Sequence, residues 1–325
     1  MIQPIELKQE LLMQVHNGVS TTTKVWEILT ASRDGNLQRV QELVQKCPGL
    51  IYAQYNYTPP VHLAVREGHA PLVEYLLNEG ALDPAYRIYP FLDNLLTIAQ
   101  DRENTTIASL LQQYLSDLSR CRFRGDNGGI HYNRSKQEQD FENAVDKEDL
   151  DTTAQLLKDN PALALDETFF WSEGILMMPA KENNQAMMQL LMSYGAKVPD
   201  VLKWTQFYYF ERYDSAVFLM EHGMNPDVMN WHHVTLLHDM AQKGALEKAA
   251  LLLKHGAQLD PIDEEYQSTP LGMAARWGHE DMVNFLLKQG ADPNKAGASW
   301  ATPLAWAKKK GHTAIESMLR RAGAA

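Results

Sequence analysis

The sequence has few cysteines, a shortage of positive charge and no long apolar run. Cys47 and Cys121 are the only cysteines among 325 residues, too few for a disulfide framework and at a spacing that fits no zinc motif. The 30 lysines and arginines are outnumbered by 41 aspartates and glutamates, which gives a formal net charge of −11. A chain of that sign has no general attraction for phosphates, so we expect no nucleic-acid partner.

The N-terminal stretch MIQPIELKQELLMQ lacks the apolar core of a signal peptide or membrane helix, because charged residues interrupt each apolar stretch. With so few cysteines, we expect a cytoplasmic protein without membrane association. The sequence also contains no Gly-rich phosphate loop, nucleophile elbow or H-E-x-x-H motif. It therefore predicts neither a cofactor nor a metal site.

What the sequence does contain is an internal repeat. The stretches TLLHDMAQKGALEKAALLLKHGA, TPLGMAARWGHEDMVNFLLKQGADPN and TPLAWAKKKGHTAIESMLRRAGA align, and their turn glycines Gly244, Gly278 and Gly311 recur at a nearly constant interval. Upstream, PPVHLAVREGHAPLVEYLLNEGALDP has Gly68 in the same place, one such interval after Gly35 of ASRDGNLQRVQELV. The pattern resembles the ankyrin repeat, a unit of about 33 residues with a turn and two helices.

This resemblance implies an all-α fold, an ankyrin-repeat solenoid of about nine helix pairs with β-hairpin fingers. We predict an N-terminal capping segment at residues 1–24, repeats 1–3 at 25–115, an Arg/Gly-rich connecting loop at 116–139, and divergent and regular repeats 4–9 at 140–325. The four central pairs lack the T-P-L-H opening and are predicted from the apolar pattern of their second helices. We expect a monomer with a single curved stack, and strands only in the fingers.

The segment 116–139 does not fit the repeat. It contains five lysines and arginines and the pair Gly128-Gly129, which permits backbone angles that other residues avoid. Loops of this length are usually functional or disordered. Two interpretations stay open: a hinge between two halves, or a loop that folds over the array and contributes His131, Tyr132 or an arginine to a site.

The repeat explains most of the eleven histidines. The ankyrin resemblance implies that His62 and His238, at the T-P-L-H position, tie neighbouring repeats through hydrogen bonds. Others follow the turn glycine or end the second helix, and we expect them to be structural: His69, His222, His255, His279 and His312. Four histidines have no repeat position, namely His16, His131, His232 and His233.

The ankyrin resemblance implies a β-hairpin finger before the T-P-L-H position, and an aromatic residue recurs at the same place in at least five of these fingers. We expect the finger tips to project from the stack. A projecting aromatic has little to pack against, and aromatic residues concentrate at recognition surfaces. We therefore predict an aromatic groove on the concave face, with charged residues at its rim. Its predicted finger residues are Tyr55, Tyr57, Trp171, Glu173, Trp231, His232, His233, Glu265, Tyr266 and Trp300, and the ends of first helices add Tyr209, Arg276 and Trp277.

Two functions fit this groove. The first, favoured by the family resemblance, is recognition of a protein or peptide. The alternative is binding of a small polar or sugar-like ligand, or an acid–base lyase, isomerase or hydrolase without a nucleotide cofactor, since a carboxylate can orient an imidazole and hold its proton near neutral pH. Adjacent histidines on an extended tip point in opposite directions, so at most one serves a given ligand. The catalytic candidates are His232, His233, Glu173, Glu265 and His131.

Overall fold

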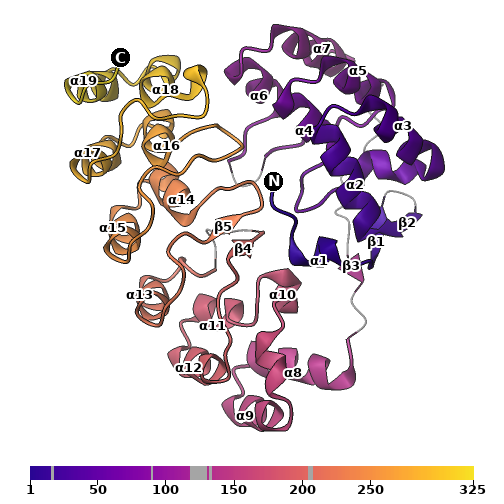
Figure 1. Cartoon of the computed structure of the whole chain (residues 1–325), viewed down its shortest axis with the longest axis vertical. Coiled ribbons are helices and arrows are strands. Elements are labelled where there is room, and N and C mark those ends of the chain that lie inside the picture. The colour runs from indigo at the N-terminus through magenta and orange to yellow at the C-terminus, as the bar shows by residue number, and fades with distance from the viewer. Residues whose placement is uncertain (16–17, 89–90, 118–129, 132–133, 204–207) are drawn as a thin grey trace. The chain divides into compact units, whose positions relative to one another are not determined.

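A computed structural model of the chain describes residues 1–15, 18–88, 91–117, 130–131, 134–203 and 208–325 (Figure 1). The chain divides into two compact units. Ile5–Asn133 form the N-terminal unit, and Met1–Pro4 with Arg134–Ala325 form the C-terminal unit. The expected single stack is therefore not confirmed, and the boundary between the units falls inside the segment 116–139.

The N-terminal unit begins with the short helix α1 (Ile5–Lys8) and continues as helix pairs. First helices α2, α4 and α6 pack in sequence against one another, and each is followed by an antiparallel second helix. A 3-10 turn, η1 (Pro48–Tyr52), follows the first pair. The helices are α2 (Thr22–Arg33), α3 (Leu37–Lys46), α4 (Pro60–Glu67), α5 (Ala70–Asn78), α6 (Leu95–Asp101) and α7 (Thr105–Leu115).

This unit also contains a three-stranded antiparallel sheet outside the fingers. In it β1 (Leu12–Val15) lies between β2 (Gly18–Thr21) and β3 (Ile130–His131), with Leu12 opposite both Thr21 and His131. The expectation of strands only in the fingers is wrong, because β1 alternates exposed and buried residues and pairs on both edges. Residues 130–131, expected in a loop, form one of its strands.

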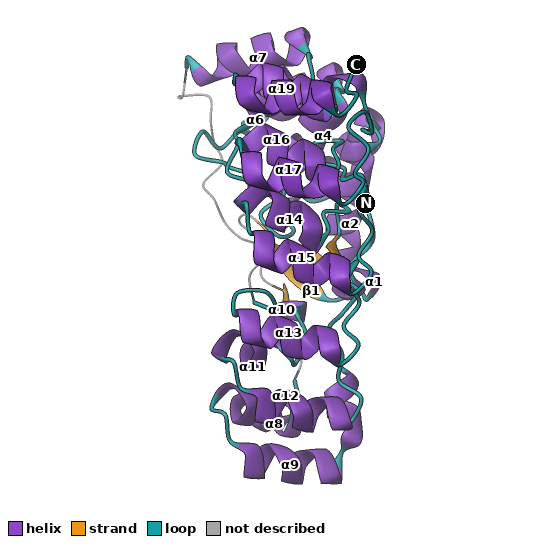
Figure 2. Cartoon of the chain, turned by 90° about the vertical axis from the view of Figure 1, so that its left-hand side faces the viewer, coloured by secondary structure: helices purple, strands orange, loops and turns teal. Residues whose placement is uncertain are grey.

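The C-terminal unit is a two-layered array. In its last repeats α14, α16 and α18 pack side by side in one layer, and α13, α15, α17 and α19 form the other (Figures 1 and 2). Its helices are α8 (Lys136–Asp146), α9 (Leu150–Asp159), α10 (Phe169–Ser172), α11 (Met177–Glu182), α12 (Gln185–Ser193), α13 (Tyr213–Glu221), α14 (Leu236–Lys243), α15 (Leu246–Lys254), α16 (Pro270–Trp277), α17 (Glu280–Lys288), α18 (Pro303–Lys310) and α19 (Thr313–Arg321).

Shorter elements join these helices. Strand β4 (Val201–Leu202) pairs in parallel with β5 (Met229–Asn230), so two successive connections are hydrogen-bonded to each other. The 3-10 turns η3 (Pro161–Leu165) and η4 (Ser299–Ala301) follow α9 and precede α18. Helix α8 begins at Lys136, earlier than predicted, because Ser135 and Glu138 form a capping box at its N-terminus.

The sequence motif determines where each regular pair begins and ends. At α16, the Thr269 hydroxyl accepts a hydrogen bond from the Gly272 amide, Pro270 occupies the first turn, and Gly278 ends the helix with φ of 81°. A Cβ atom on Gly278 would lie 2.7 Å from the His312 ring. Glycine is therefore required at this turn both for its backbone angle and for the close approach of the next repeat.

The turn histidines have the structural role expected of them. Nε2 of His69 donates to the Arg33 carbonyl at 2.7 Å, and Nε2 of His279 donates to the Gln242 carbonyl at 2.6 Å. His312 makes the same bond to Arg276 at 3.3 Å. Each imidazole thus donates a hydrogen bond to a backbone carbonyl at the end of the preceding repeat's first helix. Such terminal carbonyls have no partner inside the helix.

The described helices are all short. Among the residues that the structure describes, none of them combines the length and apolar character needed to cross a membrane.

Candidate binding surface

Two His–Glu pairs join the finger before α14 to the finger before α16. His232 and Glu265 form a short hydrogen bond through Nδ1, with both residues about 5% exposed. Nδ1 of His233 lies 2.9 Å from the Glu264 carboxylate, nearer the surface. The sequence predicted imidazole beside carboxylate here, and the structure brings these residues together.

The tip of this finger is a tight turn and not an extended strand. The Asn230 side-chain oxygen accepts hydrogen bonds from the amides of His232 and Val234, at 2.9 and 3.1 Å, and His233 has a φ of 61°. That left-handed residue turns the chain, so both imidazoles reach the same neighbouring finger. The expectation that they point in opposite directions is wrong for this reason.

Most finger aromatics are buried, so the prediction that they project is wrong. Trp231 is 1% exposed, with its ring 3.9 Å from that of His232, and its carbonyl accepts a hydrogen bond from the Ile2 amide at 2.9 Å. Tyr266 is 4% exposed because the finger folds back on itself: the Asp263 carboxylate accepts from the Tyr266 and Ser268 amides.

The finger residues Tyr55 and Tyr57 belong to the N-terminal unit. There the backbone of Tyr55 and Thr58 exchanges two hydrogen bonds around Asn56 and Tyr57, whose φ values are 48° and 60°. Tyr55 is buried and Tyr57 is 39% exposed, so only the second fits the predicted exposure.

Tyr209 and Glu173 were predicted to line the groove. In the structure they form a buried pair in the divergent middle of the chain. The Tyr209 hydroxyl donates to the Glu173 carbonyl, and the Glu173 carboxylate accepts from the Lys203 amide at 3.0 Å. Burial, followed by the negative charges of Glu173 and Glu167, raises the pKa of Tyr209 well above its ordinary value. Both residues are fully buried. The side chains of Trp171 and His131 lie outside the described residues.

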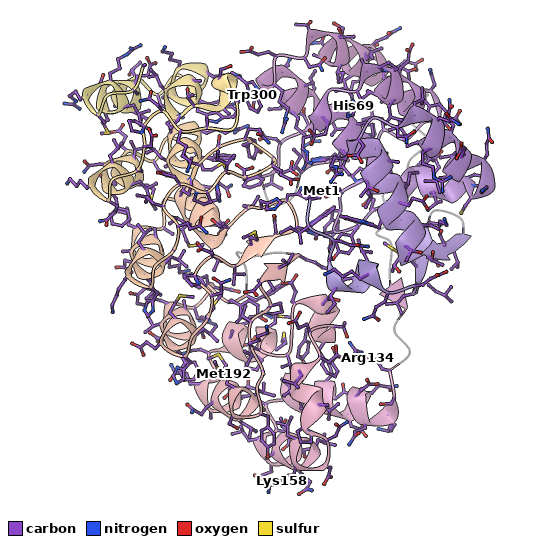
Figure 3. All side chains as sticks on the ribbon, viewed as in Figure 1. Met1, His69, Arg134, Lys158, Met192 and Trp300 are labelled. Carbon is purple, nitrogen blue, oxygen red and sulfur yellow. The ribbon has the colours of Figure 1, made fainter. Side chains whose placement is uncertain are left out.

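The remaining predicted residues meet in the last two repeats. The Arg276 guanidinium carbon lies 4.3 Å from the ring centroid of Trp277, 4.6 Å from that of Tyr266 and 4.9 Å from that of Trp306. Trp300, labelled in Figure 3, meets Trp306 edge to face at 5.8 Å. We call Tyr266, Arg276, Trp277, Trp300, Trp306 and Lys309 the aromatic–cation cluster.

Two members of this cluster were absent from the predicted set. Nζ of Lys309 lies 5.2 Å from the Trp306 centroid and 5.9 Å from that of Trp300. Lys309 could have been included, since it stands two positions before its turn glycine, as Arg276 does. Trp306 gave no such signal, because it lies inside a first helix, at a position typical of the core.

Tyr266, Arg276 and Trp306 form the buried base of the cluster, and its other three members reach the surface. The indole N–H of Trp306 donates to the Ser268 hydroxyl at 2.6 Å, and that hydroxyl donates to carbonyls of its own finger and of Ala301. Trp277 and Trp300 are half-buried and Lys309 is exposed. Cation–π contact orients the guanidinium over the rings. The surface of the cluster therefore consists of Trp277, Trp300 and Lys309 above a buried arginine and two buried rings.

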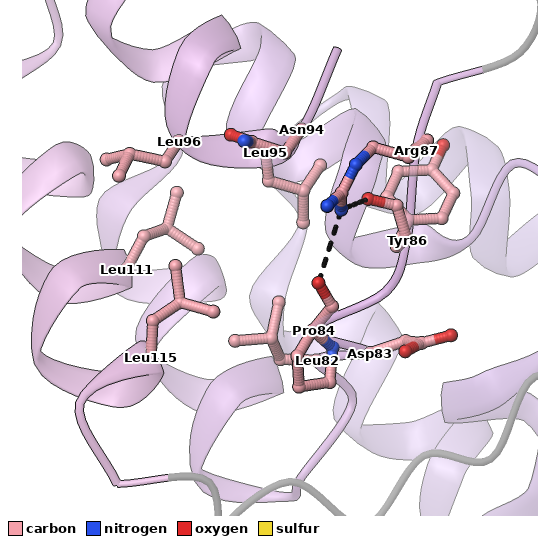
Figure 4. Close-up of a pocket in the computed structure, with 10 residues that line it drawn as sticks. All are labelled: Leu82, Asp83, Pro84, Tyr86, Arg87, Asn94, Leu95, Leu96, Leu111 and Leu115. Carbon is pink, nitrogen blue, oxygen red and sulfur yellow. Dashed lines mark hydrogen bonds between the residues drawn. The ribbon is translucent and has the colours of Figure 1, made fainter. Parts of the chain in front are cut away.

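Two small cavities are less suited to a ligand. One, of about 60 Å³, lies beside α6 and α7 and is lined mainly by leucines, with Arg87 donating to the Pro84 carbonyl at its edge (Figure 4). The other, of about 120 Å³, lies near Leu165 and Ile175. Sites for drug-sized ligands have roughly 300–1,000 Å³. Neither cavity approaches that size.

Comparison with known proteins agrees with the repeat pattern. A family profile described as Ankyrin repeats (3 copies) matches residues 205–297, and a single Ankyrin repeat profile matches residues 57–87. The chain is thus an ankyrin repeat protein, mostly helical in its described parts, and ankyrin repeats are typically protein–protein interaction modules.

Curated relatives share part of this region. Palmitoyltransferase ZDHHC13 of Mus musculus is 35% identical over 124 residues, which is 38% of this chain and 20% of the relative. Palmitoyltransferase ZDHHC17 of Danio rerio is 37% identical over 95 residues, 29% of this chain and 15% of the relative. The chain therefore matches only a fifth or less of the length of these proteins, with the similarity in the ankyrin region.

Proposed function

We propose that this chain recognises a protein or peptide partner through the aromatic–cation cluster. The observation that carries the proposal is the meeting of four aromatic rings and two cations from successive repeats. The Arg276 guanidinium lies against three of the rings, and Trp306, one of those three, also contacts Trp300 and Lys309. Aromatic residues and arginine are enriched in the buried centres of protein interfaces, where they provide most of the binding energy.

The finer description of the fold belongs to the same proposal. We take the chain to contain nine repeats with finger turns between them. Among the described residues, the sixth repeat lacks a regular first helix. Because most of the other predicted groove residues are buried, we restrict the predicted groove to its C-terminal part. We carry only a binding role over from the palmitoyltransferases, because the similarity lies in their ankyrin region. A cytoplasmic, monomeric protein remains our prediction.

Selection from a random peptide display library would test the proposal. We expect the chain to enrich a family of peptides, and Trp277→Ala and Trp300→Ala to weaken their binding about 30-fold, the scale of an interface residue worth about 2 kcal/mol. Tyr213→Ala is the matched control, since Tyr213 is a 43% exposed aromatic in α13 of the same unit. Enriched peptides that bind all three variants equally would contradict the proposal.

A second candidate function rests on the His232–Glu265 pair. A carboxylate that orients an imidazole is the arrangement required for general acid–base chemistry on a small polar ligand. A thermal-shift screen of metabolites and oligosaccharides would detect such a ligand, because binding to the folded state raises the melting temperature. A ligand whose stabilisation is abolished by His232→Gln and retained by His222→Ala would favour this function over peptide recognition.

A further inference from the structure

Lys248, in the first turn of α15, has an amine with a neutral partner. Its Nζ donates a hydrogen bond to the Glu211 backbone carbonyl at 3.0 Å, across the boundary to the preceding repeat. Among the residues that the structure describes, no carboxylate forms a salt bridge with this amine. The side chain is half-buried. A partly buried amine that is held by a carbonyl has less to stabilise its charged form than a lysine paired with a carboxylate.

The carboxylate of the same cluster is engaged by a second lysine. Asp239 is fully buried in α14, and Nζ of Lys243, one turn later in that helix, lies 2.9 Å from it. The positive charge of Lys243 also acts on Lys248. Two ammonium groups thus share the surroundings of one buried carboxylate, and only Lys243 pairs with it.

This arrangement lowers the pKa of Lys248. Burial is the main cause, and the positive charge of Lys243 lowers the pKa further. The negative charges of Asp239 and Glu211 act in the opposite direction and are outweighed. The amine therefore loses its proton at a lower pH than an ordinary lysine does, and more of it is neutral near physiological pH.

We propose that Lys248 is a modification site that takes a small activated acyl group. The neutral amine is the nucleophilic form of lysine, and partial desolvation beside another cation is an arrangement that activates it. The half-buried position admits a small acyl group such as acetyl. This inference goes beyond the proposed function, since Lys248 lies outside the aromatic–cation cluster.

The reaction needs only an activated acyl donor. After the ammonium has lost a proton to water, the Nζ lone pair attacks the acyl carbon. The new nitrogen–carbon bond forms as the bond from that carbon to the phosphate oxygen or thioester sulfur breaks. Phosphate or thiolate leaves with the electron pair, and the second amine proton passes to solvent. The acylated side chain retains one N–H that can donate to the Glu211 carbonyl, but it has lost its positive charge.

Rates of acetylation at individual lysines test the proposal. The full chain is treated briefly with acetyl phosphate at pH 7, and peptide mass spectrometry measures the initial rate at each lysine. Lys254 is the matched control, since it lies in α15 as well and is exposed. We expect Lys248 to react about threefold faster than Lys254, and to react at the same rate in urea, where the cluster is lost. A rate at Lys248 equal to or below that at Lys254 in the folded chain would overturn the proposal.

Two substitutions with opposite effects test the cause. Lys243→Gln removes a neighbouring positive charge and should slow acetylation of Lys248 about threefold, the scale of one interaction between partly exposed charges. Asp239→Asn removes a neighbouring negative charge and should accelerate it by a similar factor. Neither variant should change the rate at Lys254. Effects of the same sign at Lys248, or no effect, would overturn the proposal.

Separate reactions with acetyl phosphate and acetyl-coenzyme A distinguish the donor. Faster acetylation of Lys248 than of Lys254 by one donor alone supports the proposal and assigns that donor class. The same preference with both donors supports a general acyl acceptor. If neither donor modifies Lys248 ahead of Lys254, the proposal is wrong, and the peptide selection that tests the proposed function is unaffected.

Discussion

His238 provides the sharpest test of how the repeats are joined. It is fully buried at the third position of α14, where Nδ1 accepts hydrogen bonds from the Thr235 amide at 3.1 Å and from the Thr235 hydroxyl at 2.9 Å. Nε2 donates to the Ser268 carbonyl of the next repeat at 3.1 Å. The neutral ring, with its proton on Nε2, satisfies all these partners.

Replacing His238 by alanine removes the ring, which leaves the Thr235 amide without this hydrogen-bond partner, whereas the Ser268 carbonyl still accepts from the Asp263 amide. Each buried polar group that loses its partner costs about 1–3 kcal/mol. With the cavity added, we expect His238→Ala to lower the free energy of unfolding by about 3–5 kcal/mol at pH 7. This is a large share of the roughly 5–15 kcal/mol typical of a folded domain.

The cost of this substitution should depend on pH. Burial lowers the pKa of His238 from 6.5 to about 4, although the Ser268 and Pro261 carbonyls raise it. The unfolded chain therefore binds more protons than the folded chain between these values. The stabilisation from His238 is complete above pH 6.5 and is lost as pH falls towards 4, by about 3 kcal/mol. His238→Ala should then cost little near pH 4.

Urea unfolding of the wild type and the variant at pH 7, 5.5 and 4 measures this difference. His222→Ala is the matched control, since His222 is exposed at the end of α13. A cost of His238→Ala that stays constant from pH 7 to pH 4 would refute the reasoning, because it would mean that the folded chain protonates this ring as readily as the unfolded chain does.

Three further predictions concern two buried side chains and a helix turn. Burial raises the pKa of Asp239 from 3.8 to about 6, so its stabilising effect is present below pH 3.8 and lost as pH rises through 6. Relative to the wild type, the free energy of unfolding of Asp239→Asn should rise by about 3 kcal/mol between pH 4 and pH 7, as measured by urea unfolding. Free energies of unfolding that change with pH in parallel for the two proteins would contradict this. Trp231→Ala should cost about 3–5 kcal/mol, as expected for a core aromatic, and a melting temperature close to that of the wild type would show that the ring is not core. Gly278→Ala should lower the melting temperature more than Gly311→Ala: both glycines have positive φ, but only at Gly278 does an added Cβ meet the ring of His312. Equal effects would mean that this ring moves aside freely.

The two His–Glu pairs show how much of a contact between repeats can be predicted from the repeat period. His232 and Glu265 lie one repeat length apart, and so do Tyr266 and Ser299, the residue before Trp300. Residues one repeat length apart occupy equivalent positions in adjacent repeats, so the proximity of His232 to Glu265 was predictable. Orientation was not, because it depends on the left-handed turn at His233 and on the hydrogen bonds of Asn230 and Asp263.

The sequence by itself determined the repeat, the helix pairs at its regular ends and the roles of His238 and the turn histidines, because those depend on contacts within one repeat or between adjacent ones. The tertiary structure decided what local pattern does not encode. It divided the chain into two units, paired β1 with β3 far along the sequence and buried Trp231 and Tyr266. It also placed Arg276 and Lys309 against the ring of Trp306. A repeat pattern predicts which residues occupy equivalent positions, but burial depends on how the side chains of several repeats fill the space between them.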